Sequence, residues 1–177
     1  MRKLSLFIAM SLDGYIAKPN DNLDFLKLVD KEGEDYGYAD FTATIDTLII
    51  GRKTYDYVIK HIGAGYYDNG DRDVYIITRT PKPSSGRTTF YTGDLAELVK
   101  KLKSENGKNI YCDGGAEVIH ELLQHDLIDE LIISVIPILV GDGVKLFRDG
   151  RPEQRLELLS SKSFDTGLVQ MHYRRIR

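Results

Sequence analysis

Residues 109–124 of the chain, NIYCDGGAEVIHELLQ, contain the pattern that decides the fold. The apolar run 109–112 predicts a short strand, and the glycine pair Gly114-Gly115 ends it. From 116 to 124 apolar residues recur every three or four positions, so this range predicts a helix with one inward face. A strand that passes through glycines into a helix is typical of an α/β sheet domain.

Short apolar runs alternate with helical patterns on both sides of this stretch. Further strands are predicted at 4–10, 47–50, 74–78 and 131–138, the last in the centre of the sheet because it is long and β-branched. A closing antiparallel hairpin is predicted from 156–164 and 168–176, with its turn at Asp165-Thr166-Gly167. Further helices are predicted at 52–60, at 95–102 behind an Asp94 N-cap, and between 34 and 45.

Composition restricts the function classes. The length of 177 residues predicts one domain, residues 1–177, and the net charge of −3 argues against a nucleic-acid partner. Cys112 is the single cysteine and the four histidines show no ligand spacing, so neither a disulfide nor a metal site is expected. The N-terminal apolar run is too short to span a bilayer, so we expect no membrane partner and a cytoplasmic location.

The segment Ile50-Gly51-Arg52-Lys53-Thr54 is a second predicted strand–turn–helix junction. Free backbone N–H groups at a helix start point outward, and the helix dipole favours an anion there. Cations are disfavoured in a first helical turn, so Arg52 and Lys53 are better explained if a phosphate lies beside them. The alternative interpretation is a tight turn with two solvated basic residues.

The glycine pair at 114–115 offers similar chemistry. Glycine lets the backbone approach a ligand closely, and the helix that starts at Ala116 provides N–H donors. The full G-x-G-x-x-G motif is absent, so a standard Rossmann site is not indicated, and a turn that packs helix against sheet is the alternative. Thr78 and Arg79 follow a strand, where a hydroxyl and a cation suit an anion, although a polar loop start explains them too.

Taken in order, these motifs resemble the dihydrofolate-reductase-like superfamily. The resemblance is closest to the branch that includes the reductase domain of bacterial riboflavin biosynthesis and its stand-alone relatives. The segments that carry it are Ser11-Leu12-Asp13-Gly14-Tyr15-Ile16-Ala17, Ile50 to Tyr55, Tyr75 to Arg79, Gly114 to Glu117, Leu127 to Leu131 and Gly141 to Phe147. It implies a three-layer α/β/α fold with a central mixed, mostly parallel sheet and a C-terminal antiparallel hairpin, and a homodimer.

The resemblance also implies NADPH as cofactor and assigns roles. Gly51, Arg52, Lys53, Thr54, Thr78 and Arg79 would hold the adenosine phosphates. Gly114, Gly115, Ala116, Glu117 and Val118 would lie along the pyrophosphate, and Ala9, Ile16 and Ala17 would contact the nicotinamide. Counting back from Gly51 places Asp35 where a substrate-binding catalytic acid would fall, although a solvated helix residue is an equal interpretation.

Two departures from the resemblance limit the substrate. The chain has no tryptophan, and Pro19 lies far from the expected tryptophan–proline context, so folate reduction is in doubt. The H-x-E and P-C-x-x-C signature of a zinc deaminase is also absent. The leading hypothesis is an NADPH-dependent reductase of a pteridine, pyrimidine or similar heterocycle. The alternatives are a non-catalytic nucleotide-binding protein and a dimeric interaction protein that uses its sheet edge or the region 131–140.

Overall fold

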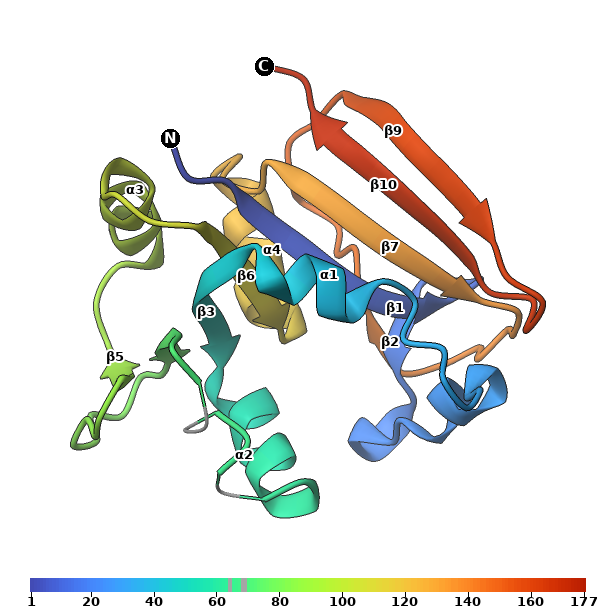
Figure 1. The fold of residues 1–177 in the computed structure, drawn as a ribbon, viewed down its shortest axis with the longest axis horizontal. Coiled ribbons are helices and arrows are strands. Elements are labelled where there is room, and N and C mark those ends of the chain that lie inside the picture. The colour runs from blue at the N-terminus through green and yellow to red at the C-terminus, as the bar shows by residue number, and fades with distance from the viewer. Residues whose placement is uncertain (64, 68–69) are drawn as a thin grey trace.

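An eight-stranded sheet forms the centre of the computed structural model, which describes residues 1–63, 65–67 and 70–177 (Figure 1). Its strand order is β5-β4-β3-β6-β1-β7-β10-β9. The strands are β1 (Leu4–Ser11), β3 (Ile45–Gly51), β4 (Asp73–Ile77), β5 (Thr88–Tyr91), β6 (Asn109–Gly114), β7 (Glu130–Ile136), β9 (Leu156–Ser163) and β10 (Val169–Arg175). All predicted strands are present, and β7 lies inside the sheet as expected.

Strand directions confirm the predicted mixed, mostly parallel sheet. The six strands from β5 to β7 pair in parallel, whereas β10 is antiparallel to both β7 and β9. The hairpin turns at 165–167, where the Gly167 amide donates to the Phe164 carbonyl at 3.0 Å. Parallel strands need crossover connections, and the helices supply them.

Two helix layers cover the sheet, as the three-layer prediction requires. On one face α3 (Leu95–Ser104) and α4 (Ala116–Gln124) pack on fully buried residues such as Leu6, Ile49 and Ile110. On the other, α1 (Tyr38–Ala43) and α2 (Arg52–His61) pack on Leu48, Ile50 and Ile76. Asp94 caps α3 by accepting the Glu97 amide at 2.8 Å, as the sequence predicts.

Several short elements were not predicted. Strand β5 is a four-residue edge strand, and β2 (Tyr15–Ala17) pairs with β8 (Val144–Lys145) in a separate small sheet. The 3-10 helices η1 (Pro19–Asp21) and η2 (Asp24–Val29) follow β2. Helix α1 is shorter than the predicted range 34–45, because Gly37 adopts a left-handed φ of 81° immediately before it. Among the described helices, none has the length and apolar character needed to cross a bilayer.

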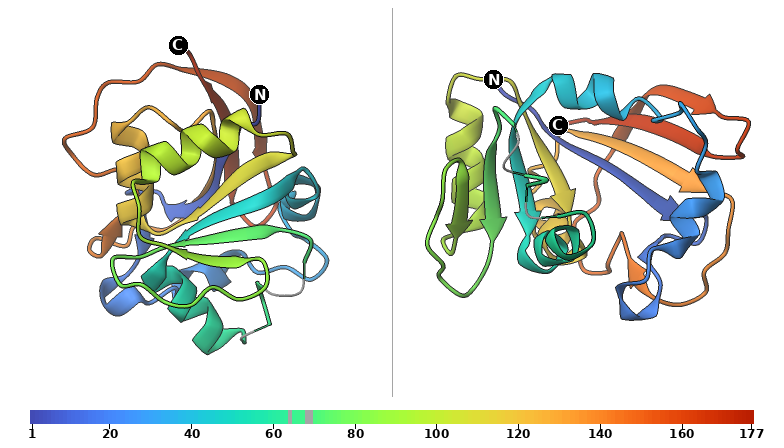
Figure 2. Two further views of the ribbon diagram at one scale, coloured as in Figure 1. Left: turned by 90° about the vertical axis from the view of Figure 1, so that its left-hand side faces the viewer. Right: turned by 60° about the horizontal axis from the view of Figure 1, so that its bottom comes forward.

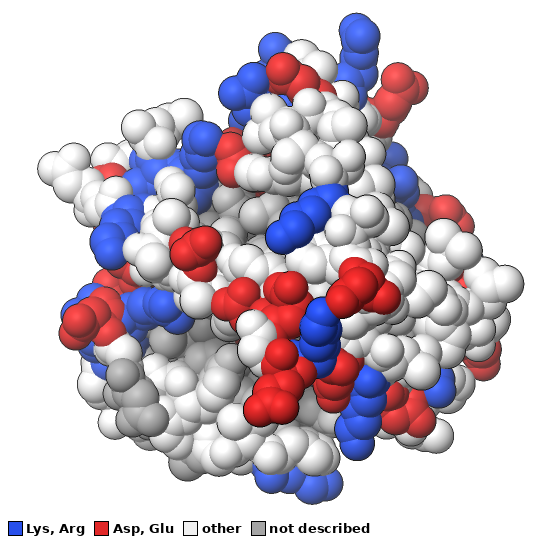
Figure 3. Space-filling view, turned by 45° about the vertical axis from the view of Figure 1, so that its right-hand side comes forward, with Lys and Arg blue, Asp and Glu red and all other residues white. Residues whose placement is uncertain are grey.

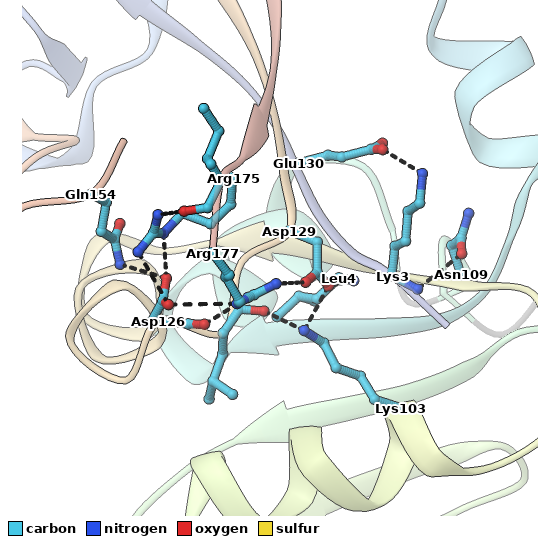
Figure 4. A network of polar contacts seen from close by, with 12 residues as sticks. Lys3, Leu4, Lys103, Asn109, Asp126, Asp129, Glu130, Gln154, Arg175 and Arg177 are labelled. Atoms are coloured by element: carbon cyan, nitrogen blue, oxygen red, sulfur yellow. Dashed lines mark hydrogen bonds and ion pairs between the residues drawn. The ribbon is translucent and has the colours of Figure 1, made fainter. Parts of the chain in front are cut away.

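A polar network holds the C-terminus against the amino ends of the parallel strands (Figure 4). These lie at the other end of the sheet from the carboxyl ends of the strands. Asp129 accepts from the Lys103 ammonium at 2.6 Å, the Leu4 amide at 2.8 Å and the Arg177 guanidinium at 2.7 Å. Nearby, Asp126 pairs with Arg175 at 2.6 Å. Burial alone would raise the pKa of Asp129, but the three donors outweigh it and lower that pKa.

We predict that Asp129→Asn lowers the free energy of unfolding at pH 7 by roughly 3 kcal/mol, because it leaves the buried Lys103 ammonium without its counter-charge. A carboxyl whose pKa is lower in the folded than in the unfolded state stabilises the fold at pH values above its unfolded pKa. This stabilisation is lost as the pH falls below about 4. The deficit of the variant should therefore shrink in acid. Denaturant unfolding at pH 7 and pH 3 measures both effects, with the exposed Asp149→Asn as control; an equal deficit at both pH values would contradict the assignment.

Candidate functional site

The three junctions singled out in the sequence meet at one edge of the sheet. In the strand register Ile50 lies beside Gly114, and Gly51 lies beside Ile77. The carboxyl ends of β3, β4 and β6 are therefore neighbours, and the helices α2 and α4 start there. Ligands of open α/β sheets bind at such carboxyl ends.

A cleft of about 520 Å³ opens at this edge. Its lining includes most of the residues predicted to hold a cofactor: Gly51, Arg52, Lys53, Thr54, Thr78, Arg79, Gly115, Ala116, Glu117 and Val118. Neither α2 nor α4 has a side-chain hydrogen bond at its N-cap, so their first-turn N–H groups remain available to a ligand. The volume lies within the range of small-molecule sites.

Glycine lets the junctions at Gly51 and Gly115 pack in direct contact. A Cβ on Gly51 would lie 3.2 Å from the Gly115 amide nitrogen and 3.3 Å from a Val118 methyl carbon. A Cβ on Gly115 would lie only 2.7 Å from the Thr54 hydroxyl. Gly114 adopts a φ of 105°, which side chains rarely tolerate. The close approach brings two helix N-termini to one cleft.

Cations around the cleft differ in their availability. Arg52 is engaged, because its guanidinium pairs with Asp56 at 2.8 Å and lies over the Phe90 ring. Lys53 and Arg79 are exposed and have no carboxylate partner among the described residues. Two cations predicted from the sequence thus remain free for an anion, and the third is already neutralised.

Some residues that line the cleft were not foreseen. Asp21, Val144 and Arg148 are among them, and Arg148 is half-buried without an ion pair in the described part of the chain. Asp13 helps to hold the segment before β8, since it accepts from the Val140 amide at 3.0 Å and the Gly141 amide at 2.7 Å. Hydrogen bonds from the Ser11 hydroxyl and these amides lower the pKa of Asp13 to about 2. No local motif marks Arg148, which follows β8 in the chain.

The residues expected beside a nicotinamide lie further along the sheet edge. Ala9 packs with the cluster around Ile136, and Ile16 packs against the α3–α4 core. Buried Ala17 pairs with Val144, which lines the cleft. Gly114 is buried behind Gly115. None of these four residues is among those that line the described cleft.

Asp35 lies outside the residues that line the cleft. Its side chain is exposed and accepts from the Gly37 amide at 2.9 Å and the Ala39 amide at 2.8 Å, so it caps the start of α1. These hydrogen bonds lower its pKa. Figure 3 shows acidic side chains gathered on the side of the molecule that carries η2, and exposed Asp24, Asp30 and Glu32 precede Asp35 there. The structure places Asp35 as a capping residue on an acidic surface.

A different carboxylate lies next to the glycine pair. Asp113 is partly buried at the end of β6, where it accepts from the Tyr111 hydroxyl at 2.7 Å and the Tyr67 hydroxyl at 3.0 Å. Burial raises the pKa of Asp113, and the two hydroxyls offset part of that effect. The sequence signal that could have found it is a lone carboxylate at the end of an otherwise apolar strand.

Comparison with known proteins gives consistent matches over nearly the whole chain. The RibD C-terminal domain model matches residues 2–170. The uncharacterized protein YwjB of Bacillus subtilis (strain 168) is 39% identical over 173 residues, 97% of each chain. A solved structure from Shewanella sp. PV-4, named for riboflavin biosynthesis, aligns with a TM-score of 0.88 and 30% identity over 99% of both chains.

A more distant match shows the fold alone. It is the diaminohydroxyphosphoribosylaminopyrimidine deaminase/5-amino-6-(5-phosphoribosylamino)uracil reductase of Thermotoga maritima, with a TM-score of 0.72 and 13% identity. The match covers 99% of the present chain and 57% of the Thermotoga chain. The sheet and its helices therefore recur as one part of a longer protein.

We predict that Gly114→Ala lowers the free energy of unfolding by roughly 1–2 kcal/mol, because an alanine is strained at the left-handed φ of this residue. Gly70→Ala is the matched control, since its backbone has no positive φ and the nearest atom to an added Cβ is 3.9 Å away. Chemical denaturation compares the two variants. Equal stability of Gly114→Ala and the wild type would show that the junction tolerates a side chain.

Proposed function

The chain belongs to the RibD C-terminal domain family, and from this premise we propose that it is an NADPH-dependent reductase of a pteridine, pyrimidine or similar heterocyclic substrate in the cytoplasm. One observation carries the proposal: the predicted phosphate-binding junctions at 51, 78 and 115 line a single cleft. Uncapped helix N-termini and free cations in one cleft suit a dinucleotide diphosphate.

The residues present fit the proposed cofactor. Gly51, Arg52, Lys53 and Thr54, with Thr78 and Arg79, would hold the adenosine phosphates, and Gly115 to Val118 would lie along the pyrophosphate. Arg148, which also lines the cleft, would add a further cation for the phosphates. When bound, NADPH supplies a hydride to an electrophilic carbon. The protein would orient the two partners and exclude water between them.

The proposed nicotinamide site consists of residues next to the cleft. Ala17 lies beside cleft-lining Val144, and Ala9 and Ile16 lie on the adjacent strands β1 and β2. Small and apolar side chains leave room for a flat ring to lie against the sheet edge. We propose that the ring lies there and that the heterocyclic substrate stacks on it.

A nucleotide-binding protein without turnover is the alternative. The exposed position of Asp35 favours it, because the acid expected from sequence does not reach the cleft. Loss of NADPH absorbance in the presence of dihydrofolate, ribosylamino-pyrimidines or related heterocycles separates the two functions. Tight NADPH binding with no oxidation across such a series would favour the alternative.

We also propose that two copies of the chain associate through the hairpin face, defined as Leu156, Leu158, Val169, Met171 and Tyr173. The hairpin extends beyond the helices in Figure 1 and in the right-hand view of Figure 2. Leu156, Leu158 and Val169 are 41%, 52% and 40% exposed. Strands in which apolar and polar side chains alternate have one apolar face, and this face is normally buried. A second copy of the chain can bury it in a symmetric dimer. In the other suggested region, 131–140, Leu131, Ile133 and Ile136 are buried, whereas Leu139, beyond Pro137, is 70% exposed.

For the cofactor, we predict that NADPH binds more tightly than NADH in calorimetric titration. Arg79→Ala should weaken NADPH binding by about 10- to 100-fold and leave NADH binding almost unchanged, because it would remove a partner of the 2′-phosphate. Arg148→Ala should weaken both cofactors alike, since the pyrophosphate is common to them. Arg87→Ala, whose guanidinium pairs with Asp73 outside the cleft, is the control. Equal weakening of both cofactors by Arg79→Ala would refute its assigned role.

For the association, we predict that the wild type sediments with twice the chain mass and that Leu158→Glu sediments as a monomer. A buried charge in an apolar interface costs several kcal/mol, which is enough to dissociate a dimer of ordinary affinity. Ser160→Glu is the matched control, because Ser160 pairs with His172 on the other face of the hairpin. A monomeric wild type, or a monomeric Ser160→Glu with a dimeric Leu158→Glu, would contradict the proposed face.

A further inference from the structure

Among the residues that line the cleft, Arg52 is held by two other side chains. Its Nε atom donates to both oxygens of Asp56, at 2.8 Å and 2.9 Å. Its guanidinium carbon lies 5.5 Å from the centre of the Phe90 ring, a distance typical of a cation–π contact. The side chain of Arg52 is 24% exposed, so it reaches the cleft with little freedom to move.

The contact with Asp56 uses only one of the three guanidinium nitrogens. The two terminal nitrogens, Nη1 and Nη2, have no hydrogen-bond partner among the described residues. The strongest arginine–carboxylate pairs are forks, in which two nitrogens donate in parallel to two oxygens, and this pair is of a different kind. Asp56 therefore offsets the charge of Arg52 but leaves free the edge of the guanidinium that can form a fork with a phosphate.

Helix stability does not explain why these two residues are paired. Arg52 is the first residue of α2, where a cation opposes the helix dipole. An acidic residue four positions after a basic one is also the weaker order for a pair on a helix surface. The side chain of Asp56 is 53% exposed, and such pairs contribute little to the free energy of unfolding. The arrangement is better explained by the orientation that it gives to Arg52.

The free edge of Arg52 belongs to a residue that lies beside a second available cation. In the register of β3 and β4, Gly51 lies beside Ile77. Arg52 and Thr78 are therefore the first residues beyond these two strands, and Arg79 is the next. Arg79 also lines the cleft and has no ion-pair partner among the described residues. Two guanidinium groups from adjacent strand ends suit forked hydrogen bonds to a phosphate.

We propose that Asp56 and Phe90 are positioning residues that fix the orientation of Arg52, so that its terminal nitrogens meet an adenosine phosphate of the cofactor. This role depends on the proposed NADPH-binding function. Charge alone predicts that removal of Asp56 tightens binding of an anion, because Arg52 regains its full charge. The positioning role predicts weaker binding, because the ligand must then order a flexible side chain.

The test is calorimetric titration of NADPH at about 0.15 M salt, which screens the field of an exposed carboxylate. Asp56→Ala should weaken NADPH binding by about 3- to 10-fold. Asp56→Glu keeps a carboxylate within reach of Arg52 and should restore the affinity. Glu121→Gln is the control for charge, since it removes a cleft-lining carboxylate without an ion-pair partner in the described residues and should not weaken binding. Unchanged or tighter binding by Asp56→Ala overturns the inference.

A double-mutant cycle shows whether Asp56 and Phe90 act through Arg52. Lysine has a single nitrogen, so Arg52→Lys cannot be held by a carboxylate and also present a free edge. In the Arg52→Lys background, neither Asp56→Ala nor Phe90→Leu should weaken NADPH binding any further. Equal weakening in both backgrounds would show that Asp56 and Phe90 support the site without Arg52, and would overturn the positioning role.

A readout without cofactor completes the test. Nitrogen NMR of arginine-labelled protein should show an Arg52 Nε–H group that exchanges slowly with water in the wild type and rapidly in Asp56→Ala. Rapid exchange in the wild type overturns the inference, whatever the affinities. Tight NADPH binding that Asp56→Ala leaves unchanged defeats the inference alone and keeps the proposed cofactor. Failure of the wild type to bind NADPH defeats the proposed function itself, and with it the inference.

Discussion

Direct backbone contact between two strand–helix junctions is the constraint on which the site depends. The Gly51 and Gly115 backbones approach so closely that a Cβ at Gly51 would lie 3.2 Å from the Gly115 nitrogen. This approach places the first turns of α2 and α4 at one cleft, and no side chain caps either helix. Backbone N–H groups left without a partner favour an anion. A bound anion accepts their hydrogen bonds and removes the free-energy cost of leaving them unpaired.

Charge around the junctions is distributed unevenly. Arg52 is held by Asp56, so it contributes less to the cleft than its sequence position suggests. Arg79 and Arg148 both line the cleft and have no ion-pair partner among the described residues, which leaves them available to a ligand. Figure 3 shows acidic side chains gathered on one face of the molecule. The cleft lining itself carries both signs of charge, since Asp21, Glu117 and Glu121 line it together with Arg52, Lys53, Arg79 and Arg148.

The two ends of the parallel strands carry different kinds of carboxylate. At the amino ends, Asp129 is surrounded by an ammonium, an amide and a guanidinium, which lower its pKa and stabilise the fold. At the carboxyl end of β6, the donors to Asp113 among the described residues are two phenols, and burial raises its pKa. Saturated ion pairs are typical of a structural role, whereas a partly satisfied carboxyl is suited to exchange a proton.

Much of the fold could be predicted because it depends on local pattern. Helix α4 has the predicted bounds, Asp94 caps α3, and every predicted strand forms, since hydrophobic periodicity and capping act over a few residues. Glycine-spaced junctions predicted most of the cleft lining. The short strands β2, β5 and β8 escaped prediction, because strands of two to four residues owe their conformation to distant partners.

The sequence by itself determined the order of strands and helices and the residue types that meet at the cleft. Only the tertiary structure decided that Arg148 lines it, that Asp35 caps α1 at the surface, and that Asp113 is enclosed by Tyr67 and Tyr111. The physical reason is that a side chain's charge and hydrogen bonds depend on burial and on neighbours from remote segments. Tyr67 and Asp113 are 46 residues apart along the chain, and no local spacing encodes their contact.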